Sequence, residues 1–449
     1  MIVDAYSGQH SAVAPAALTH YAAAVTAVAA HRAAAGEHLA AALAEAPDFL
    51  AAHVLKGFAA VILARRETMT AARDALGAAR IIAAEAVRAP GELALLESLA
   101  FAVDGELRAA ARRLDVHLLD NPRDFLAIKL SHAMNFMAGN LHGMLKTTGM
   151  VLNDWSPRVP GYGFVLGCHA FGLEEAGDLD AAETLGMAAL RHEPTDAWGL
   201  HAVSHVFEMD GRTQDGVRWL EATRPVWSNC NNFAFHMGWH LALFHVAQGR
   251  HDLALAVYDA EIRPVSTEDF RDVVNAVSLL WRLRQENVAV GARWEELHGV
   301  ARRRTADTTL LFTSLHHLLT MIAVGDRAGA RAVAHEIAAR AAQGGDQGRV
   351  GAAIGTELAA ALLGLADASA PAPDFMRLAE GVTQLGGSHA QRDVFLRTLA
   401  LIAADRADRR AANAVLQCRR AFRHDDRFVG LALGRLNFAL KAREERAVA

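Results

Sequence analysis

Apolar residues in the middle of the chain recur at helical spacing. Between Asp124 and Gly139, Leu126, Leu130 and Met134 are four residues apart, and Met137 follows three residues later. Side chains with this spacing lie on one face of an α-helix. Alanine fills many of the other positions, where neighbouring helices must approach closely. No segment has the alternating β-branched pattern of a strand, so the sequence predicts an all-α fold.

Polar turns divide the helical stretches at a regular interval. Successive turn glycines are 34, 38, 34 and 38 residues apart: Gly105, Gly139, Gly177, Gly211 and Gly249. One turn glycine per unit at this period is typical of a tetratricopeptide-type helix-turn-helix solenoid. Pro122 and Pro194 end helix pairs in the same region, and Asp124 and Asp196 are placed to cap the next pair.

The repeats loosen towards the C-terminus. Gly325 follows Gly249 by 76 residues, which is two units of similar length, and residues 404–406 mark a last, degenerate turn. Residues 344–351 and 368–373 are predicted to be surface connections, because neither is long or polar enough for a domain linker. We therefore expect one α-solenoid domain over residues 1–449, with N-terminal repeats in 1–100, regular repeats in 101–330 and degenerate repeats in 331–449.

Composition and charge exclude several classes of protein. The formal charge of −5 and the pI near 6.5 provide no basic field for nucleic acid, and residues 302–304 form too short an arginine run to supply one. Three widely spaced cysteines, Cys168, Cys230 and Cys418, are expected to be reduced thiols. The uncharged stretch at residues 5–31 is alanine-rich and reads as helical sequence rather than as a signal peptide or membrane span. We expect a cytoplasmic protein with neither nucleic acid nor membrane as a partner.

Histidines concentrate on the first helix of each predicted pair. They precede the turn glycine by six to nine residues in most pairs, as in His132, His169, His205, His240 and His316. In tetratricopeptide arrays the first helices line the concave face, so these imidazoles are predicted to form a belt inside the superhelix, together with His201, His236 and His317. The alternative is that each histidine is a packed residue with one hydrogen-bonded nitrogen.

Two histidine pairs stand out because each has i, i+4 spacing on successive first helices. They are His201 with His205, and His236 with His240. Residues four apart lie on one helical face, so the four imidazoles are candidate ligands of a divalent transition metal of the zinc or iron class. Glu208 or Asp272 is a candidate oxygen ligand. No HExxH motif or facial-triad spacing supports the site.

A second reading of these residues needs no metal. One histidine then acts as general base, oriented by Glu208 or Asp272, while an arginine holds an anionic substrate. The candidate catalytic residues under either reading are His201, His205, Glu208, Asp272 and His316. Four of the seven tryptophans lie between positions 198 and 239; most are expected to pack between repeats, and one or two, such as Trp239, are candidates for a pocket wall.

The chain resembles the family of tetratricopeptide repeat protein 38 over nearly its whole length. The resemblance rests on residues 194–198 with His201, His205, Glu208 and Met209; on His236 with residues 239–240; and on residues 272–274, Leu280, 282–283, 290–291, 293–294, 311–312, His316, 386–388 and 390–395. The sequence departs from the family pattern at Leu315, His317 and His389. The resemblance implies an α-superhelix with atypical repeats and brings no settled activity.

The resemblance also directs attention to the segment GGSHAQRDVF at residues 386–395. Ser388 is placed to cap the helix that follows, with Gln391 and Arg392 near its start. If the superhelix curls into a closed ring, Arg392 faces the histidine belt and binds a carboxylate or phosphate. The alternative is a helix cap with a solvated salt bridge.

Two functions therefore remain open. The first is an enzyme, of hydrolase or lyase type, that acts on a small polar or anionic substrate inside the superhelix; its ligand-binding candidates are His132, Trp239, Arg282, Gln391 and Arg392. The second is a non-enzymatic repeat scaffold that binds a protein or peptide in its concave groove. The sequence favours a small molecule over a protein partner and leaves the oligomeric state open.

Overall fold

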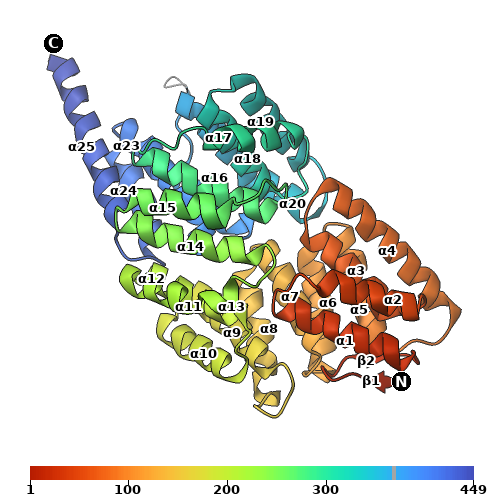
Figure 1. The fold of residues 1–449 in the computed structure, drawn as a ribbon. Coiled ribbons are helices and arrows are strands. Elements are labelled where there is room, and N and C mark those ends of the chain that lie inside the picture. Colours follow the sequence, from red (N-terminus) through yellow and green to blue (C-terminus); the bar gives the residue numbers. More distant parts are fainter. Residues whose placement is uncertain (367–370, 449) are drawn as a thin grey trace. The chain divides into compact units, whose positions relative to one another are not determined.

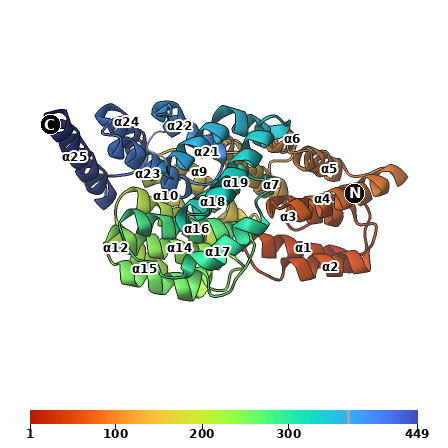
Figure 2. The same cartoon turned by 90° about the horizontal axis from the view of Figure 1, so that it is seen from above.

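The chain folds as an all-α array, as predicted. The computed structural model describes residues 1–366 and 371–448 (Figures 1 and 2). The chain divides into two compact units. The first comprises Met1–Val206 and Ala222–Ala234, and the second comprises Phe207–Glu221 and the chain from Phe235 onward. The boundaries fall within two helices, α11 (Ala197–Met209) and α14 (Phe233–Ala247).

The first unit consists of antiparallel helix pairs. Its elements are α1 (Pro15–Ala29), α2 (Ala35–Glu45), α3 (Leu50–Ile62), α4 (Arg66–Glu85), α5 (Pro90–Val103), α6 (Leu107–Asp120), α7 (Phe125–Met137), α8 (Leu141–Val151), η1 (Leu152–Asp154), α9 (Tyr162–Glu175), α10 (Leu179–His192), most of α11, and α13 (Arg224–Trp227). Within pairs, α5 packs on α6, α7 on α8 and α9 on α10. First helices also pack on each other, as in α3 with α5 and α7 with α9, which is the stacking of a solenoid.

The second unit continues the pairing and then becomes less regular. It contains α12 (Thr213–Ala222) apart from its last residue, most of α14, α15 (His251–Val257), the π-turn η2 (Tyr258–Ile262), α16 (Phe270–Gln285), α17 (Arg293–Arg303), α18 (Leu311–Val324), α19 (Arg327–Ala341), α20 (Gly345–Val350), the π-turn η3 (Gly351–Gly355), α21 (Thr356–Leu363), η4 (Gly364–Ala366), α22 (Phe375–Gly381), η5 (Val382–Leu385), α23 (His389–Asp405), α24 (Arg409–Arg420) and α25 (Arg427–Val448). Here α16 packs on α18, and α23 packs on both α24 and α25.

The predicted turn glycines occupy the turns between paired helices. All five have a positive φ, from 62° for Gly139 to 87° for Gly177. L-residues with a Cβ rarely adopt this conformation, which explains why glycine recurs at the repeat period. The degenerate last turn reaches the same conformation without glycine, at Ala407 with φ 55°.

Two local predictions are wrong. Residues 5–14 are not helical: two short strands, β1 (Ile2–Val3) and β2 (Gln9–His10), pair antiparallel. The Asp4 carboxylate holds the turn between them, because it accepts hydrogen bonds from the backbone N–H groups of Tyr6 and Gly8, both at 2.8 Å. Of the expected surface connections, residues 344–351 instead form α20 and enter η3. The other, at 368–373, lies partly outside the described residues.

A buried glutamine explains why residues 344–351 are not a surface loop. The side-chain oxygen of Gln347 accepts a hydrogen bond of 2.8 Å from the backbone N–H of Leu311, at the start of α18. This bond satisfies a helix-terminal donor that lacks an intrahelical partner, so α20 serves as part of the packing of α18.

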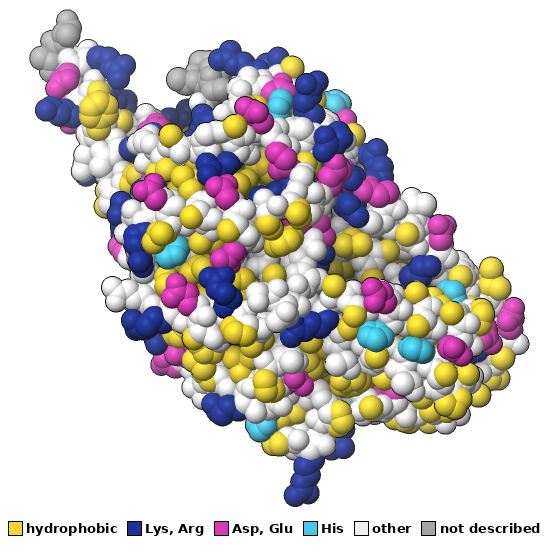
Figure 3. Space-filling view, in the orientation of Figure 1, with side chains coloured by type: hydrophobic (Ala, Val, Ile, Leu, Met, Phe, Trp, Pro, Cys, Tyr) yellow, Lys and Arg dark blue, Asp and Glu magenta, His cyan; other side chains and the backbone are white. Residues whose placement is uncertain are grey.

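The surface agrees with the absence of a basic field in the composition. On the face shown in Figure 3, basic and acidic side chains are interspersed among apolar ones. Within the described part of the chain, no helix is both long and apolar enough to cross a bilayer. All three cysteines are free thiols.

Candidate metal and ligand site

Asp196 fixes the start of α11, as predicted. Its carboxylate accepts hydrogen bonds from the backbone N–H groups of Trp198 at 3.2 Å and Gly199 at 3.0 Å. Burial raises the pKa of Asp196 to about 7. The cap sets the rotation of the helix, which places His201 and His205 on its buried face, one turn apart.

The α11 histidines pack in an aromatic setting within the first unit. Their ring centroids are 4.3 Å apart, and the ring of His201 stacks on Phe171 at 5.3 Å. Nδ1 of His205 lies 3.3 Å from Oε2 of Glu174. Both histidines are at most 1% exposed. This pair therefore combines two buried imidazoles with a buried carboxylate.

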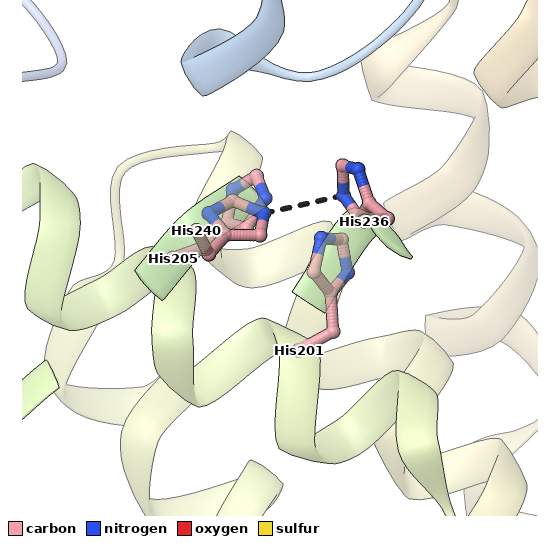
Figure 4. Close-up of side chains that lie close together, drawn as sticks. All are labelled: His201, His205, His236 and His240. Atoms are coloured by element: carbon pink, nitrogen blue, oxygen red, sulfur yellow. Dashed lines mark hydrogen bonds between the residues drawn. The ribbon is translucent and has the colours of Figure 1, made fainter. Parts of the chain in front are cut away.

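The α14 histidines, within the second unit, face each other. Nε2 of His236 and Nε2 of His240 are 3.2 Å apart (Figure 4). Nδ1 of His240 lies 2.9 Å from Oε2 of Glu208, and Nδ1 of His236 lies 3.2 Å from Oδ1 of Asn275. A carboxylate or amide oxygen can only accept, so each Nδ1 carries the donated proton. Both Nε2 atoms consequently direct lone pairs towards one another.

Two sets of buried side chains offer ligand atoms that could hold a metal ion. One is the histidine cluster predicted from the sequence: His201, His205, His236 and His240 (Figure 4). The other has ligand atoms within 4.8 Å of one another and consists of Glu174, Glu175 and His205. Nitrogen and carboxylate oxygen are suitable ligands for zinc-class ions. A buried histidine cluster able to hold a metal is therefore present.

Glu208 joins the α14 pair to a network of buried ion pairs. Its Oε1 accepts a hydrogen bond of 2.7 Å from Arg423, which lies 3.4 Å from Asp426. Arg419 donates to Asp426 at 2.7 Å and to Asp393 at 2.6 Å. Burial alone would raise the pKa of Asp426, but Arg419 and Arg423 outweigh burial and hold that pKa well below its usual range. The network thus keeps its carboxylates ionised.

A small cavity lies beside the network. Its volume is about 10 Å³, enough for about one water molecule, and its walls include Glu208, Arg282, Asp393 and Arg423. Arg282 was predicted from the sequence to bind ligand. The cavity therefore brings a predicted ligand-binding residue and the partner of His240 to one place.

Two other predicted residues adjoin Arg282 in the second unit. The Trp239 ring stacks on His236 with centroids 5.3 Å apart, and the Arg282 guanidinium carbon lies 5.7 Å from the centre of the Trp239 ring. His316, on α18, interacts electrostatically with Arg282. Its Nδ1 donates a hydrogen bond of 2.7 Å to the carbonyl of Phe312, and burial lowers its pKa to about 3. Arg282, Trp239 and His316 thus form one buried polar group.

The remaining predicted residues have structural partners elsewhere. His132 accepts a hydrogen bond of 3.1 Å from the indole N–H of Trp198, and burial lowers its pKa to about 3. Asp272 accepts a bond of 2.5 Å from Thr267 at the start of α16, and burial raises its pKa to about 6. Neither residue belongs to a candidate metal set among the described residues.

The segment before α23 is a helix cap, which was the simpler of the two expectations. Ser388 and Gln391 form a capping box: Oγ of Ser388 accepts from the backbone N–H of Gln391 at 3.3 Å, and Oε1 of Gln391 accepts from that of Ser388 at 3.1 Å. Arg392 donates to the carbonyl of Gly387 and lies 3.2 Å from Nδ1 of His389.

Every histidine of the predicted belt lies on the first helix of its pair. These helices are α7, α9, α11, α14 and α18, which carry His132, His169, His201, His205, His236, His240, His316 and His317. His169 nevertheless has a packing role, because its Nδ1 lies 2.8 Å from the Thr148 hydroxyl.

Sequence reasoning missed Glu174, Asn275, Arg419 and Arg423. Arg419 and Arg423 fall in the charged run RRAFRHDDR at residues 419–427, which resembles a solvated surface, although both are at most 8% exposed. Their i, i+4 spacing was the available signal. Asn275 lies seven residues before Arg282 on α16, and this two-turn spacing gave a similar signal.

A comparison of the sequence with models of known protein families gives no match. The argument for function consequently rests on the geometry of the site.

Proposed function

We propose that this protein is a metal-dependent enzyme in which His236 and His240 are two ligands of a divalent transition metal ion of the zinc or iron class. The observation that carries the proposal is the separation of 3.2 Å between their Nε2 atoms. Two nitrogen ligands of one tetrahedral zinc ion, each about 2.05 Å from the metal, are about 3.3 Å apart. The observed separation supports this arrangement.

The partners of the two Nδ1 atoms support the same proposal. Glu208 and Asn275 accept from His240 and His236 respectively, so both imidazoles direct their Nε2 lone pairs inward. Carboxylate or carbonyl partners of this kind orient metal-ligating histidines and increase their basicity. Without a cation or a proton between them, two facing lone pairs repel each other. His201 and His205 are the candidates for the remaining ligands.

A metal at this position would activate water or polarise a carbonyl or phosphoryl oxygen. The substrate class that fits is a small polar or anionic molecule, because the neighbouring groups are Arg282, Trp239 and His316 in a buried setting. Hydrolase or lyase chemistry follows from this combination. Glu208, which holds both His240 and Arg423, is a positioning residue. The resemblance to the tetratricopeptide repeat protein 38 family is part of this proposal and adds no activity to it.

The alternative is a scaffold that binds a peptide in a concave groove. Buried imidazoles held by buried acceptors give a peptide no surface to contact, so the α14 pair favours the enzyme.

Metal analysis of untagged protein tests the proposal. Wild-type protein purified without chelators should contain about one zinc-class ion per chain, and His236→Ala and His240→Ala should each lose it. His245→Ala is the matched control, because His245 is a buried histidine on the same helix outside both candidate metal sets. Chromogenic 4-nitrophenyl esters then test for metal-dependent hydrolysis. Metal-free wild-type protein that cannot be loaded with zinc would overturn the proposal.

A further inference from the structure

Three buried polar atoms in the second unit have no hydrogen-bond partner among the described residues: Nε1 of Trp239, Nδ2 of Asn275 and Nε2 of His316. The three side chains are at most 1% exposed. Buried polar atoms in folded proteins are nearly always paired, and those without protein partners occur where a ligand supplies one. These three atoms therefore mark a place where a polar molecule fits.

The three atoms surround the same residues. The Trp239 ring stacks on His236, and the Asn275 side chain contacts Nδ1 of that histidine at 3.2 Å. Arg282 lies over the Trp239 ring at 5.7 Å and interacts electrostatically with His316. The group thus adjoins a candidate metal ligand on one side and a buried guanidinium on the other.

The hydrogen-bonding character of each atom is fixed. Trp239 Nε1 and Asn275 Nδ2 can only donate. His316 donates from Nδ1 to the carbonyl of Phe312 at 2.7 Å, so its Nε2 can only accept. Burial lowers the pKa of His316 to about 3, which keeps the imidazole neutral near pH 7. Two donors and one acceptor therefore await a ligand.

Arg282 supplies a positive charge without a close counterion among the described residues. Arg397, Arg419 and Arg423 each have a carboxylate oxygen within 3.0 Å. The carboxylate paired with Arg282, that of Asp393, is 4.0 Å away and is shared with Arg419. The guanidinium donates instead to neutral groups, namely Ser278 and the carbonyl of Ala390.

We propose that this group binds a small carboxylate that also carries a hydroxyl or ammonium group. Arg282, Trp239 and Asn275 receive the carboxylate, and Nε2 of His316 accepts the hydrogen bond from the hydroxyl or ammonium. A single under-compensated guanidinium matches one negative charge, which favours a carboxylate over a doubly charged phosphate. The cavity beside Arg282, with room for about one water molecule, keeps the ligand small. This inference names the substrate class of the proposed enzyme and rests on that function.

Glycolate and acetate are suitable probes, because they differ by one hydroxyl. Saturation-transfer NMR on the full chain should show glycolate binding at least tenfold more tightly than acetate, since a site built to accept a hydrogen bond rejects the analogue that lacks the donor. His316→Leu should abolish this preference and leave acetate binding unchanged. His317→Leu, which replaces the buried neighbour of His316, is the matched control and should keep the preference. Equal binding of glycolate and acetate by the wild type overturns the proposal, and so does tighter binding of inorganic phosphate.

A second variant covers the case in which His316→Leu does not fold. Trp239→Phe keeps an aromatic ring against His236 but removes the N–H donor, and it should weaken glycolate and acetate by a similar factor of about tenfold. Unchanged binding of both probes in this variant contradicts the proposal.

Each titration is run on zinc-loaded and on chelator-treated protein, with the metal content measured separately. Glycolate preference in protein that never binds metal would overturn the metal-dependent function and keep this inference. Bound metal without glycolate preference would do the reverse.

Discussion

Nε2 of His236 and Nε2 of His240 face each other at 3.2 Å across one turn of α14, and Nδ1 of each imidazole contacts an acceptor on another helix. Glu208 comes from α11 and Asn275 from α16. Helix packing therefore determines which nitrogen of each histidine carries its proton. This arrangement explains why a pair of packed histidines can act as a ligand pair.

Glu208→Gln should weaken metal binding without removing a ligand of the α14 pair. The amide keeps the size of the side chain but loses the charge that makes His240 more basic, and such changes around metal-ligating histidines lower affinity by about 10–100-fold. Competition against a fluorescent zinc chelator measures the change. Glu286→Gln is the matched control, because Glu286 pairs with Arg397 in the same network and contacts neither α14 histidine. Equal zinc affinity in Glu208→Gln and wild type would contradict the role of Glu208.

Buried neutral histidines should make the protein less stable below neutral pH. Burial lowers the pKa of His132 and of His316 to about 3 and that of His317 to about 4. In the unfolded chain these groups have pKa values near 6.5, so the unfolded state binds protons that the native state does not. Their contribution to stability is complete above about pH 6.5 and falls as the pH drops towards 4, by about 1.4 kcal/mol per pH unit for each histidine.

Urea unfolding at a series of pH values between 7.5 and 5 measures this loss. His317→Leu should lower the slope of the unfolding free energy against pH by about one proton's worth, or roughly 1.4 kcal/mol per unit below pH 6. An identical slope in variant and wild type would show that His317 is protonated in the native state.

Asp393→Asn should be strongly destabilising. The Asp393 carboxylate accepts two hydrogen bonds from Arg419, at 2.6 and 3.2 Å, and both side chains are 2% exposed. Removing one partner of a buried ion pair leaves an uncompensated charge and typically costs about 3–5 kcal/mol. The neighbouring exposed pair provides the control: Asp425→Asn, which loses a 2.7 Å contact with Arg420, should cost about 0–1 kcal/mol. Similar losses in the two variants, measured in urea, would argue against the buried network.

The turn before α24 offers a stabilising substitution. Ala407 has φ 55°, whereas the corresponding turn position in the regular repeats is glycine. The left-handed conformation costs an L-residue about 1 kcal/mol, so Ala407→Gly should stabilise the protein by up to about 1 kcal/mol. The reverse change, Gly177→Ala at φ 87°, should destabilise it by about the same amount. A destabilised Ala407→Gly variant would show that backbone strain at this turn is negligible.

The sequence predicted the repeat turns well because their cause is local. A glycine at Gly177 or Gly249 and a cap at Asp196 act within a few residues, so their spacing gives the period directly. The same local rules failed at residues 5–14, where Asp4 holds a turn in alanine-rich sequence, and at Gln347, whose role depends on a helix start 36 residues away.

The candidate site was predicted less completely. The i, i+4 spacing of His236 and His240 is visible in the sequence, and so is that of His201 and His205. The partners that orient a histidine come from other helices: Asn275 is 39 residues from His236. Arg423 is 215 residues from Glu208, so no spacing rule connects the two. Gln391 was predicted to bind ligand, whereas its side chain completes a helix cap. Polar residues at helix starts have this second use, which sequence alone does not separate from ligand binding.

Anomalous X-ray diffraction above the zinc absorption edge, from crystals of untagged protein grown with zinc, tests the central claim most directly. The account predicts one strong anomalous peak about 2.0–2.2 Å from Nε2 of both His236 and His240. A map with no peak at that position, while the two nitrogens remain 3.2 Å apart, would contradict it.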